Sequence, residues 1–379
     1  MNNSELKTLI KKQKTNYSLD QEFYVSQHIF DLDVKNIFSK QWVFVGHISR
    51  IPNYGDYFLF NIGKESIIII RDKDNAVHAH YNVCRHRGSQ ICLENEGNSK
   101  VLICPYHAWT YNIDGSLKGA RLMDKDFNKN DWHLHKCNSK IFEGLIFINL
   151  SEHPNDFEEF IAPTKKFIEF HGLADAKIAH RQYYPTDGNW KLTLDNFHEC
   201  YHCQPSHPEY CQVHDKDYIV AYGAGSNTGP ASEKFDNILT EWNTKVKKMG
   251  HLTGEYSETE FNDYSRSAER TPLKEGMFTE TKTGKPISKL MGNFKDYDCG
   301  YTSVGTSPFN SLLMCNDFAT LFTFIPISPL YTQVELMWLV HKDAEEGKDY
   351  NIEEMKWMWD VTTIADKRII EDNQKGVLS

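Results

Sequence analysis

The feature that most constrains this chain of 379 residues is a pair of short motifs, each of which combines one cysteine with one histidine. One residue separates Cys84 from His86, and two residues separate Cys104 from His107; 17 residues lie between the two motifs. Thiolate and imidazole groups supply most transition-metal sites in proteins. The spacing therefore predicts that two loops meet at one metal centre.

Two kinds of centre fit two cysteines and two histidines. A tetrahedral zinc ion takes such ligands, and so does a [2Fe–2S] cluster with two cysteines on one iron and two histidines on the other. Structural zinc motifs more often use Cys-x2–4-Cys and His-x3–5-His than the tight Cys-x-His loop. Gly88 and Pro105 stand beside the ligands and favour the cluster, because they let backbone N–H groups approach its sulfurs.

A second candidate metal site lies further along the chain. We expect a helix over residues 189–202, on which Glu199 and His202 share a face. Pro205 should end this helix, so that His207 returns toward the same point. Two histidines and one carboxylate form the facial triad of non-haem Fe(II) sites, which leaves positions open for O2 and substrate.

The carboxylate of this triad has two candidates in the sequence. Glu199 is the nearer one, and Asp366 is better placed. A helix expected over residues 352–374 has an apolar face that includes Trp359 and Ile370, and Asp366 lies in its middle. A carboxylate on a buried face is costly unless it is paired or binds a metal.

The two motifs fall in regions with different hydrophobic patterns, and together these patterns predict an α+β fold. Short strand-like runs separated by turn signals occupy residues 40–152 and predict an all-β domain. Residues 153–379 mix helical periods with alternating strands and predict helices on an antiparallel sheet. We expect residues 1–39 to form a helical segment on this second domain. Residues 221–298 are polar, and we expect an insertion or lid without chemistry.

Composition excludes several classes of protein. The chain has 42 Lys and Arg against 52 Asp and Glu, a net charge of −10, which is the wrong sign for nucleic-acid binding through phosphates. The sequence shows no secretory signal and no apolar run long enough to span a membrane. We therefore expect a cytoplasmic protein, in which the nine cysteines are thiols and metal ligands rather than a disulfide framework.

The residues around both sites carry a family resemblance. The loops Cys-Arg-His-Arg-Gly at residues 84–88 and Cys-Pro-Tyr-His-Ala-Trp at residues 104–109 resemble the Rieske domain of the Rieske non-haem iron oxygenases. The segment from Asn189 to Pro208 is similar to the catalytic signature of their α subunits, and Asp366 with Gln374 and Gly376 matches the place of their aspartate ligand.

This resemblance implies two metal centres and a route between them. It implies a [2Fe–2S] cluster and a mononuclear Fe(II) ion in each subunit of a homotrimer. Glu199 is then a bridge that links the iron site of one subunit to the cluster residue His107 of its neighbour. The implied ligands are Cys84, His86, Cys104 and His107 for the cluster and His202, His207 and Asp366 for the mononuclear iron.

The substrate class follows from a narrower similarity. Glu199 and the segment of residues 338–350 resemble the branch of the family that oxidises quaternary ammonium compounds such as glycine betaine. The expected reaction uses O2 and electrons from an NAD(P)H-dependent flavin or ferredoxin-type reductase to hydroxylate an N-methyl group, which then leaves as formaldehyde. Aromatic faces hold a methylated ammonium group well, and Phe309, Phe318 and Phe322 are candidates for this contact.

Two other functions remain open from the sequence. The first is an aromatic-ring hydroxylating dioxygenase α subunit, which would form a diol or phenol and release no formaldehyde. The second is a zinc-binding module without catalysis, because two cysteines and two histidines also suit that ion.

Overall fold

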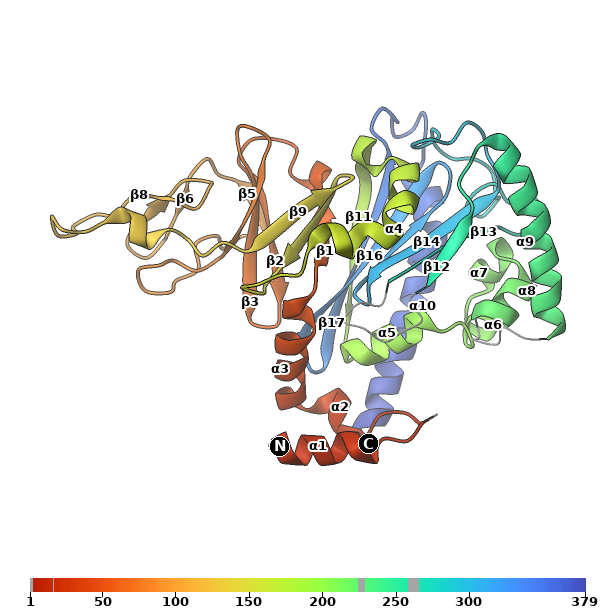
Figure 1. Cartoon of the computed structure of the whole chain (residues 1–379), viewed down its shortest axis with the longest axis horizontal. Helices are drawn as coiled ribbons and strands as arrows, with labels where there is room; N and C mark the ends of the chain where they lie inside the picture. Colours follow the sequence, from red (N-terminus) through yellow and green to blue (C-terminus); the bar gives the residue numbers. More distant parts are fainter. Residues whose placement is uncertain (1–2, 16, 224–228, 258–265) are drawn as a thin grey trace. The chain divides into compact units, whose positions relative to one another are not determined.

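The computed structural model describes residues 3–15, 17–223, 229–257 and 266–379. The chain divides into two compact units, one of residues 38–157 and one of residues 1–37 together with 158–379 (Figure 1). These limits lie close to the expected ones near residues 40 and 153. One unit is all-β and the other combines helices with an antiparallel sheet, which confirms the α+β class.

The unit of residues 38–157 contains three antiparallel sheets. The first sheet has the strand order β1 (Val43–His47), β10 (Leu145–Asn149) and β9 (Asn138–Phe142). The second has the order β4 (Val77–Tyr81), β3 (Glu65–Arg71), β2 (Asp56–Ile62) and β5 (Glu96–Asn98). The third has the order β6 (Leu102–Ile103), β7 (Thr110–Tyr111) and β8 (Leu117–Gly119). Short 3-10 turns cover Phe38–Lys40, Ile48–Arg50 and Lys129–Trp132.

The apolar run of β3 shows how this unit positions its loops. Residues 67–70 are four consecutive isoleucines, all fully buried, because the strand is covered on both faces. Ile68 and Ile70 belong to the same core cluster as Cys84 and Cys104. The two cysteine loops are therefore anchored on the hydrophobic core of their own unit.

The other unit is built on one seven-stranded antiparallel sheet. Its strand order is β11 (Ala176–Thr186), β17 (Tyr331–His341), β16 (Phe318–Ser328), β15 (Asn310–Met314), β14 (Gly300–Ser307), β13 (Ser267–Pro272) and β12 (Gly254–Ser257). The helices are α1 (Asn3–Lys12), α2 (Glu22–Val25), α3 (Gln27–Asn36), α4 (Phe157–His171), α5 (Trp190–His198), α6 (Cys203–Ser206), α7 (Pro208–Val213), α8 (Lys216–Tyr218), α9 (Pro230–Met249) and α10 (Ile352–Leu378), with a 3-10 turn at Leu173–Asp175 and a π-helical turn at Ile219–Gly223.

The long helix α10 is the element that brings the C-terminal part of the chain to the site. Asn351 begins it by accepting a hydrogen bond from the N–H of Glu354, an N-cap that satisfies one of the free donors of the first turn. The helix contacts β11, α5 and α7. Its buried face includes Met355, Trp359 and Ile370, at the spacing that the sequence predicted.

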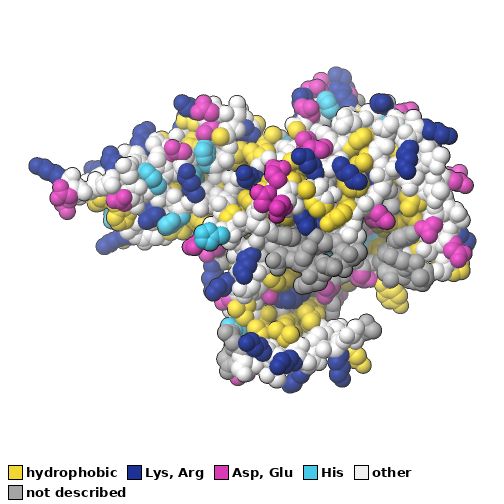
Figure 2. All heavy atoms as spheres, in the orientation of Figure 1, with side chains coloured by type: hydrophobic (Ala, Val, Ile, Leu, Met, Phe, Trp, Pro, Cys, Tyr) yellow, Lys and Arg dark blue, Asp and Glu magenta, His cyan; other side chains and the backbone are white. Residues whose placement is uncertain are grey.

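No helix in the described part of the chain is both long and apolar enough to cross a membrane. Figure 2 shows basic and acidic side chains interspersed over the face that it draws, without a broad basic patch among the coloured residues.

A buried charge network holds one end of the sheet together. Asp298, which is fully buried, accepts two hydrogen bonds of 2.9 Å from the Nη2 of Arg270. It also accepts hydrogen bonds from His251 Nδ1 at 2.7 Å, from the N–H of Gly300 at 2.9 Å and from Asn316 Nδ2 at 3.0 Å. A buried ion pair is tolerated only when its remaining hydrogen-bonding groups are satisfied in this way.

Replacing this carboxylate should leave the Arg270 guanidinium buried and without its counter-ion. We expect Asp298→Ala to lower the free energy of unfolding by about 3–5 kcal/mol, measured by urea titration of the fluorescence signal. The control is Asp296→Ala, an exposed position two residues away, which should change stability by less than about 0.5 kcal/mol. Equal stability of the two variants would contradict the role given to Asp298.

Candidate metal centres

The two cysteine loops have the same backbone geometry. In the first, the N–H of Cys84 donates to the carbonyl of Ser89 at 2.8 Å, and the N–H of Gly88 donates back to Cys84 at 2.9 Å. In the second, the N–H of Cys104 donates to the carbonyl of Trp109 at 2.8 Å. Gly88 has φ +76°, a conformation that glycine adopts without cost.

The four expected cluster ligands separate into an inner and an outer pair. Cys84 and Cys104 are buried, whereas His86 is half-buried and His107 is exposed. The two imidazole rings lie 4.6 Å apart between centroids, and within the described part of the chain the buried Nδ1 of His86 has no hydrogen-bond partner. Two inner thiols, two outer imidazoles and an orphaned ring nitrogen fit a cluster held by two cysteines on one iron and two histidines on the other.

Burial raises the pKa of the Cys84 thiol, although the hydroxyl of Tyr111, 3.3 Å from Cys84 Sγ, acts in the opposite direction. A thiol in such surroundings is held as a thiolate when it binds a metal ion.

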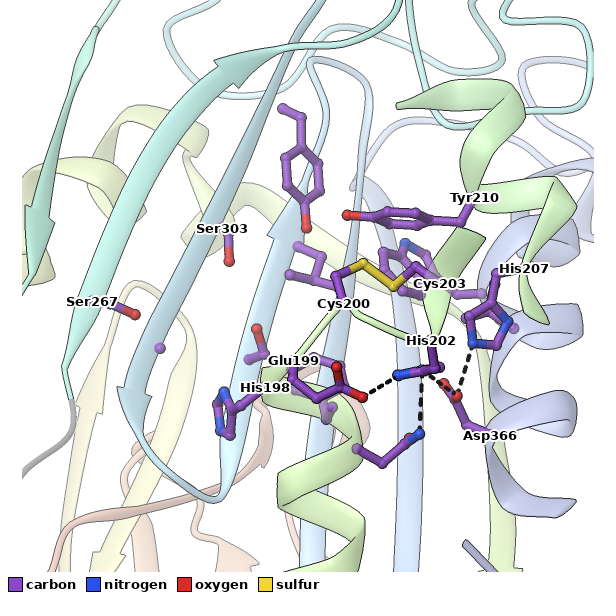
Figure 3. A pocket seen from close by; sticks show the side chains of 18 of the residues that line it. His198, Glu199, Cys200, His202, Cys203, His207, Tyr210, Ser267, Ser303 and Asp366 are labelled. Carbon is purple, nitrogen blue, oxygen red and sulfur yellow. Dashed lines mark hydrogen bonds and ion pairs between the residues drawn. A yellow bond between two sulfur atoms is a disulfide. The ribbon is translucent and has the colours of Figure 1, made fainter. Parts of the chain in front are cut away.

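The three expected ligands of the second centre lie together. The Nε2 atoms of His202 and His207 are 3.2 and 2.9 Å from the same carboxylate oxygen, Asp366 Oδ1 (Figure 3). One ligand atom from each of these residues lies within 4.8 Å of the others. Two imidazoles and one carboxylate on one side of a centre form the donor set of a facial triad.

The Asp366 carboxyl is anionic in this setting. Burial alone would raise its pKa, but the hydrogen bonds with His202 and His207 outweigh burial, so the pKa of Asp366 lies below its ordinary value. An ionised carboxylate between two imidazoles suits a divalent cation.

A second carboxylate stands behind each imidazole. Glu199 Oε1 lies 2.6 Å from His202 Nδ1, and Glu209 Oε1 lies 3.3 Å from His207 Nδ1. Glu209 is itself held by Thr362, whose hydroxyl donates to it at 2.9 Å. Histidines that bind metals usually turn their other nitrogen to a carboxylate or carbonyl, which fixes the ring and raises its basicity.

The local backbone differs from the expected continuous helix. Helix α5 ends at His198, and Glu199 has an extended conformation with φ −125° and ψ 146°. The Glu199 side chain accepts the N–H of Tyr201 at 2.6 Å and so satisfies this backbone donor outside a helix. Glu199 and His202 therefore meet across a turn rather than on one helix face, and Pro205 lies inside the short α6.

Cys200 and Cys203 differ from the expectation that all nine cysteines are thiols or metal ligands, because these two are joined in a disulfide. The seven other cysteines are free. A single bridge across three residues is not a disulfide framework.

A cavity of about 260 Å³ opens beside the triad. His202, His207 and Asp366 form part of its wall. The rest of the wall includes Tyr210, Tyr218, Tyr301 and Trp359 as well as Ser267, Glu269 and Ser303. Figure 3 labels Tyr210, Ser267 and Ser303 among them. The cavity thus combines a metal-binding group with aromatic and polar side chains, as small-molecule sites do.

None of the three phenylalanines expected at the substrate lines this cavity. Phe309, Phe318 and Phe322 are almost completely buried. Phe309 packs on the ring of Trp190, 5.9 Å away, and Phe322 packs on Trp359, 5.3 Å away. They belong to the hydrophobic core, and Phe322 packs directly behind Trp359, which does line the cavity.

The segment of residues 221–298 contributes to the cavity, against the expectation that it lacks chemistry. It contains β13, which supplies Ser267 and Glu269 to the wall; part of the segment lies outside the described residues. Buried Ala268 and Arg270 alternate with half-buried Glu269, as in a strand that has one face buried. This alternation could have predicted the strand, but it spans few residues within a polar stretch.

Comparison with known proteins identifies both units. Residues 41–137 match the Rieske [2Fe-2S] domain, and residues 173–379 match the catalytic domain of the ring hydroxylating alpha subunit. The chain is 35% identical over 376 residues to the glycine betaine monooxygenase oxygenase subunit of Pseudomonas aeruginosa, covering 98% of this chain and 85% of that protein. The corresponding subunit of Chromohalobacter salexigens is 32% identical over 98% of this chain and 82% of its own length.

A solved structure shares the fold. A quaternary ammonium Rieske monooxygenase, described for carnitine oxidation by gut microbiota, superimposes with a TM-score of 0.70 at 24% identity over 95% of this chain and 85% of its own. The chain therefore belongs to the Rieske non-haem iron oxygenases, as a catalytic oxygenase subunit with a [2Fe–2S] domain and a mononuclear iron domain.

The cluster ligands can be tested by removing one thiol. We expect Cys84→Ala to abolish the visible spectrum and the acid-labile sulfide of the purified protein, because the inner iron loses half of its thiolates. The matched control is Cys137→Ala, which removes a buried free thiol of the same unit outside the two loops and should keep the spectrum. A full spectrum in Cys84→Ala, or a colourless wild type that holds zinc, would contradict the cluster.

The carboxylate of the triad can be tested separately. We expect Asp366→Ala to lower turnover at least about 100-fold and to lose the iron in excess of the cluster, because replacing even the hydrogen-bond partners of metal ligands costs 10- to 100-fold. The cluster spectrum should persist, because its ligands lie in other loops. Asp372→Ala, an exposed position on the same helix, is the control. Full turnover of Asp366→Ala would refute the assignment.

Proposed function

We propose that this protein hydroxylates an N-methyl group of a quaternary ammonium compound such as glycine betaine. O2 and two electrons enter with two protons; one oxygen atom enters the methyl C–H bond and the other leaves as water. The hydroxymethyl ammonium product then loses formaldehyde and a proton, which leaves a tertiary amine. For glycine betaine this amine is dimethylglycine.

The observation that carries the proposal is that the triad and a small aromatic cavity share one wall. His202, His207 and Asp366 could together hold a metal ion, and all three line the cavity. Iron in such a site supplies the activation of O2. The protein places the substrate carbon beside it.

The shape and lining of the cavity suit a compact cation. A trimethylammonium group cannot donate hydrogen bonds, so aromatic faces and carboxylates recognise it. Tyr210, Tyr218, Tyr301 and Trp359 all contribute to the wall. The relatives that act on glycine betaine support the same substrate class.

The electrons come from an NAD(P)H-dependent reductase in the cytoplasm, which delivers them to the cluster. We further propose a homotrimer in which Glu199, already bound to His202, also reaches the cluster residue His107 of the partner subunit. A carboxylate in this position orients both imidazoles. The exposure of His107 is consistent with such a contact.

The substrate class can be tested with a panel of methylated amines. With a matched reductase, NAD(P)H and O2, we expect equal amounts of formaldehyde and dimethylglycine from glycine betaine, measured by formaldehyde derivatisation and mass spectrometry. Carnitine, choline and proline betaine complete the panel. Asp366→Ala is the control, because any formaldehyde that this variant forms does not depend on the triad. The absence of formaldehyde with all four amines, or a diol from an aromatic compound, would overturn the proposal.

A further inference from the structure

The wall of the cavity contains a further carboxylate, Glu269, that the metal chemistry does not use. Glu269 lies on β13, between Ala268 and Arg270, which are buried on the other face of the sheet. Successive residues of a strand point to opposite faces. Glu269 therefore shares its face with Ser267, and both line the cavity.

The neighbouring strand continues this face. In the register of β13 with β14, Glu269 is opposite Ser303 and Ser267 is opposite Gly305, and all four residues line the cavity. The hydroxyl of Tyr218 donates to Glu269 Oε1 at 2.8 Å and so holds the carboxylate in place.

No cationic side chain of the described residues pairs with Glu269. Arg270, its neighbour in sequence, turns to the opposite face and is bound to Asp298. The nearby His214 directs its Nε2 to Glu280, 3.0 Å away. Among the described residues that line the cavity there is no lysine or arginine.

The charge next to Glu269 has the same sign. In the register of β12 with β13, Glu255 is directly opposite Glu269, and like charges in such a pair are destabilising. Burial raises the pKa of the Glu269 carboxyl, whereas the hydrogen bond from Tyr218 lowers it. A cation in the cavity would stabilise the ionised form and supply the missing partner.

We infer that Glu269 is the residue by which this cavity selects substrates for positive charge. Its carboxylate, with the rings of Tyr210, Tyr218 and Tyr301 in the same wall, holds a permanently cationic ammonium group, while Asp366 and the two histidines would hold the metal. This inference rests on the proposed function for the identity of the cation, but it concerns recognition and not turnover.

The consequence is that discrimination depends on charge rather than on shape. Choline and 3,3-dimethylbutan-1-ol have nearly the same shape, but a nitrogen cation in the first replaces a neutral carbon in the second. Glycine betaine and 3,3-dimethylbutanoate form a second pair of this kind. The wild-type protein should bind choline more tightly than its neutral isostere, and it should bind zwitterionic glycine betaine more tightly than its anionic isostere.

The experiment measures dissociation constants of both pairs by calorimetry on the iron-loaded, cluster-containing protein. Glu269→Gln keeps the size of the side chain and its ability to accept the Tyr218 hydrogen bond. We expect it to weaken choline and glycine betaine about 10- to 100-fold and to change the two isosteres less than about 3-fold. Glu269→Asp, which keeps the charge, should retain part of the preference.

The matched control is Glu255→Gln, which removes the same charge from the opposite position of the strand pair, outside the cavity wall. It should shift every dissociation constant less than about 3-fold. Unchanged cluster spectrum, iron content and melting temperature verify the fold of each variant.

The outcomes separate this inference from the proposed function. If Glu269→Gln keeps the wild-type preference for cations, the inference is overturned, whether or not formaldehyde is formed. If the preference collapses in Glu269→Gln and not in Glu255→Gln, the inference is supported, even when no amine of the panel yields formaldehyde and the proposed function fails.

Discussion

The catalytic unit depends on one shared acceptor, the Oδ1 atom of Asp366. Two imidazoles from the segment after α5 converge on this atom, which belongs to a helix more than 150 residues later in the chain. Because the carboxylate lies among buried residues of α10, the helix cannot rotate without separating these three side chains. All three also line the cavity, so the same contact fixes one part of its wall.

The sequence predicted what short spacing and helical period determine. Cys84 lies close to His86 along the chain, and Cys104 lies close to His107. This short spacing allowed the sequence to predict that each loop supplies one thiolate and one imidazole. A carboxylate that interrupts the apolar stripe of a long helix made Asp366 a candidate, and the family resemblance selected it over Glu199. The break of the helix at Glu199 was not predicted, because it depends on a side chain that accepts the N–H of Tyr201.

Most of the residues that line the cavity could not be predicted from the sequence. Aromatic content suggested a cage, but which face of a strand a ring occupies depends on register and tertiary contacts, and Phe309 and Phe322 proved to be core residues. Glu269 was missed for the converse reason. Its strand is short and lies in a polar stretch, where the alternation carries little hydrophobic signal, and its burial depends on the neighbouring strand and α8.

The position of Asp366 on α10 is also fixed by a residue with no part in the chemistry. Asn189 donates its backbone N–H to Gln374 Oε1 at 2.8 Å, and its side-chain amide donates to the carbonyls of Tyr24 and Pro329 at 2.9 and 2.7 Å. Gln374 follows Asp366 by eight residues, about 12 Å along the helix. The spacing between Asp366 and Gln374 therefore determines which way the carboxylate points. One residue more or fewer between them would turn it about 100° around the helix axis, away from both histidines.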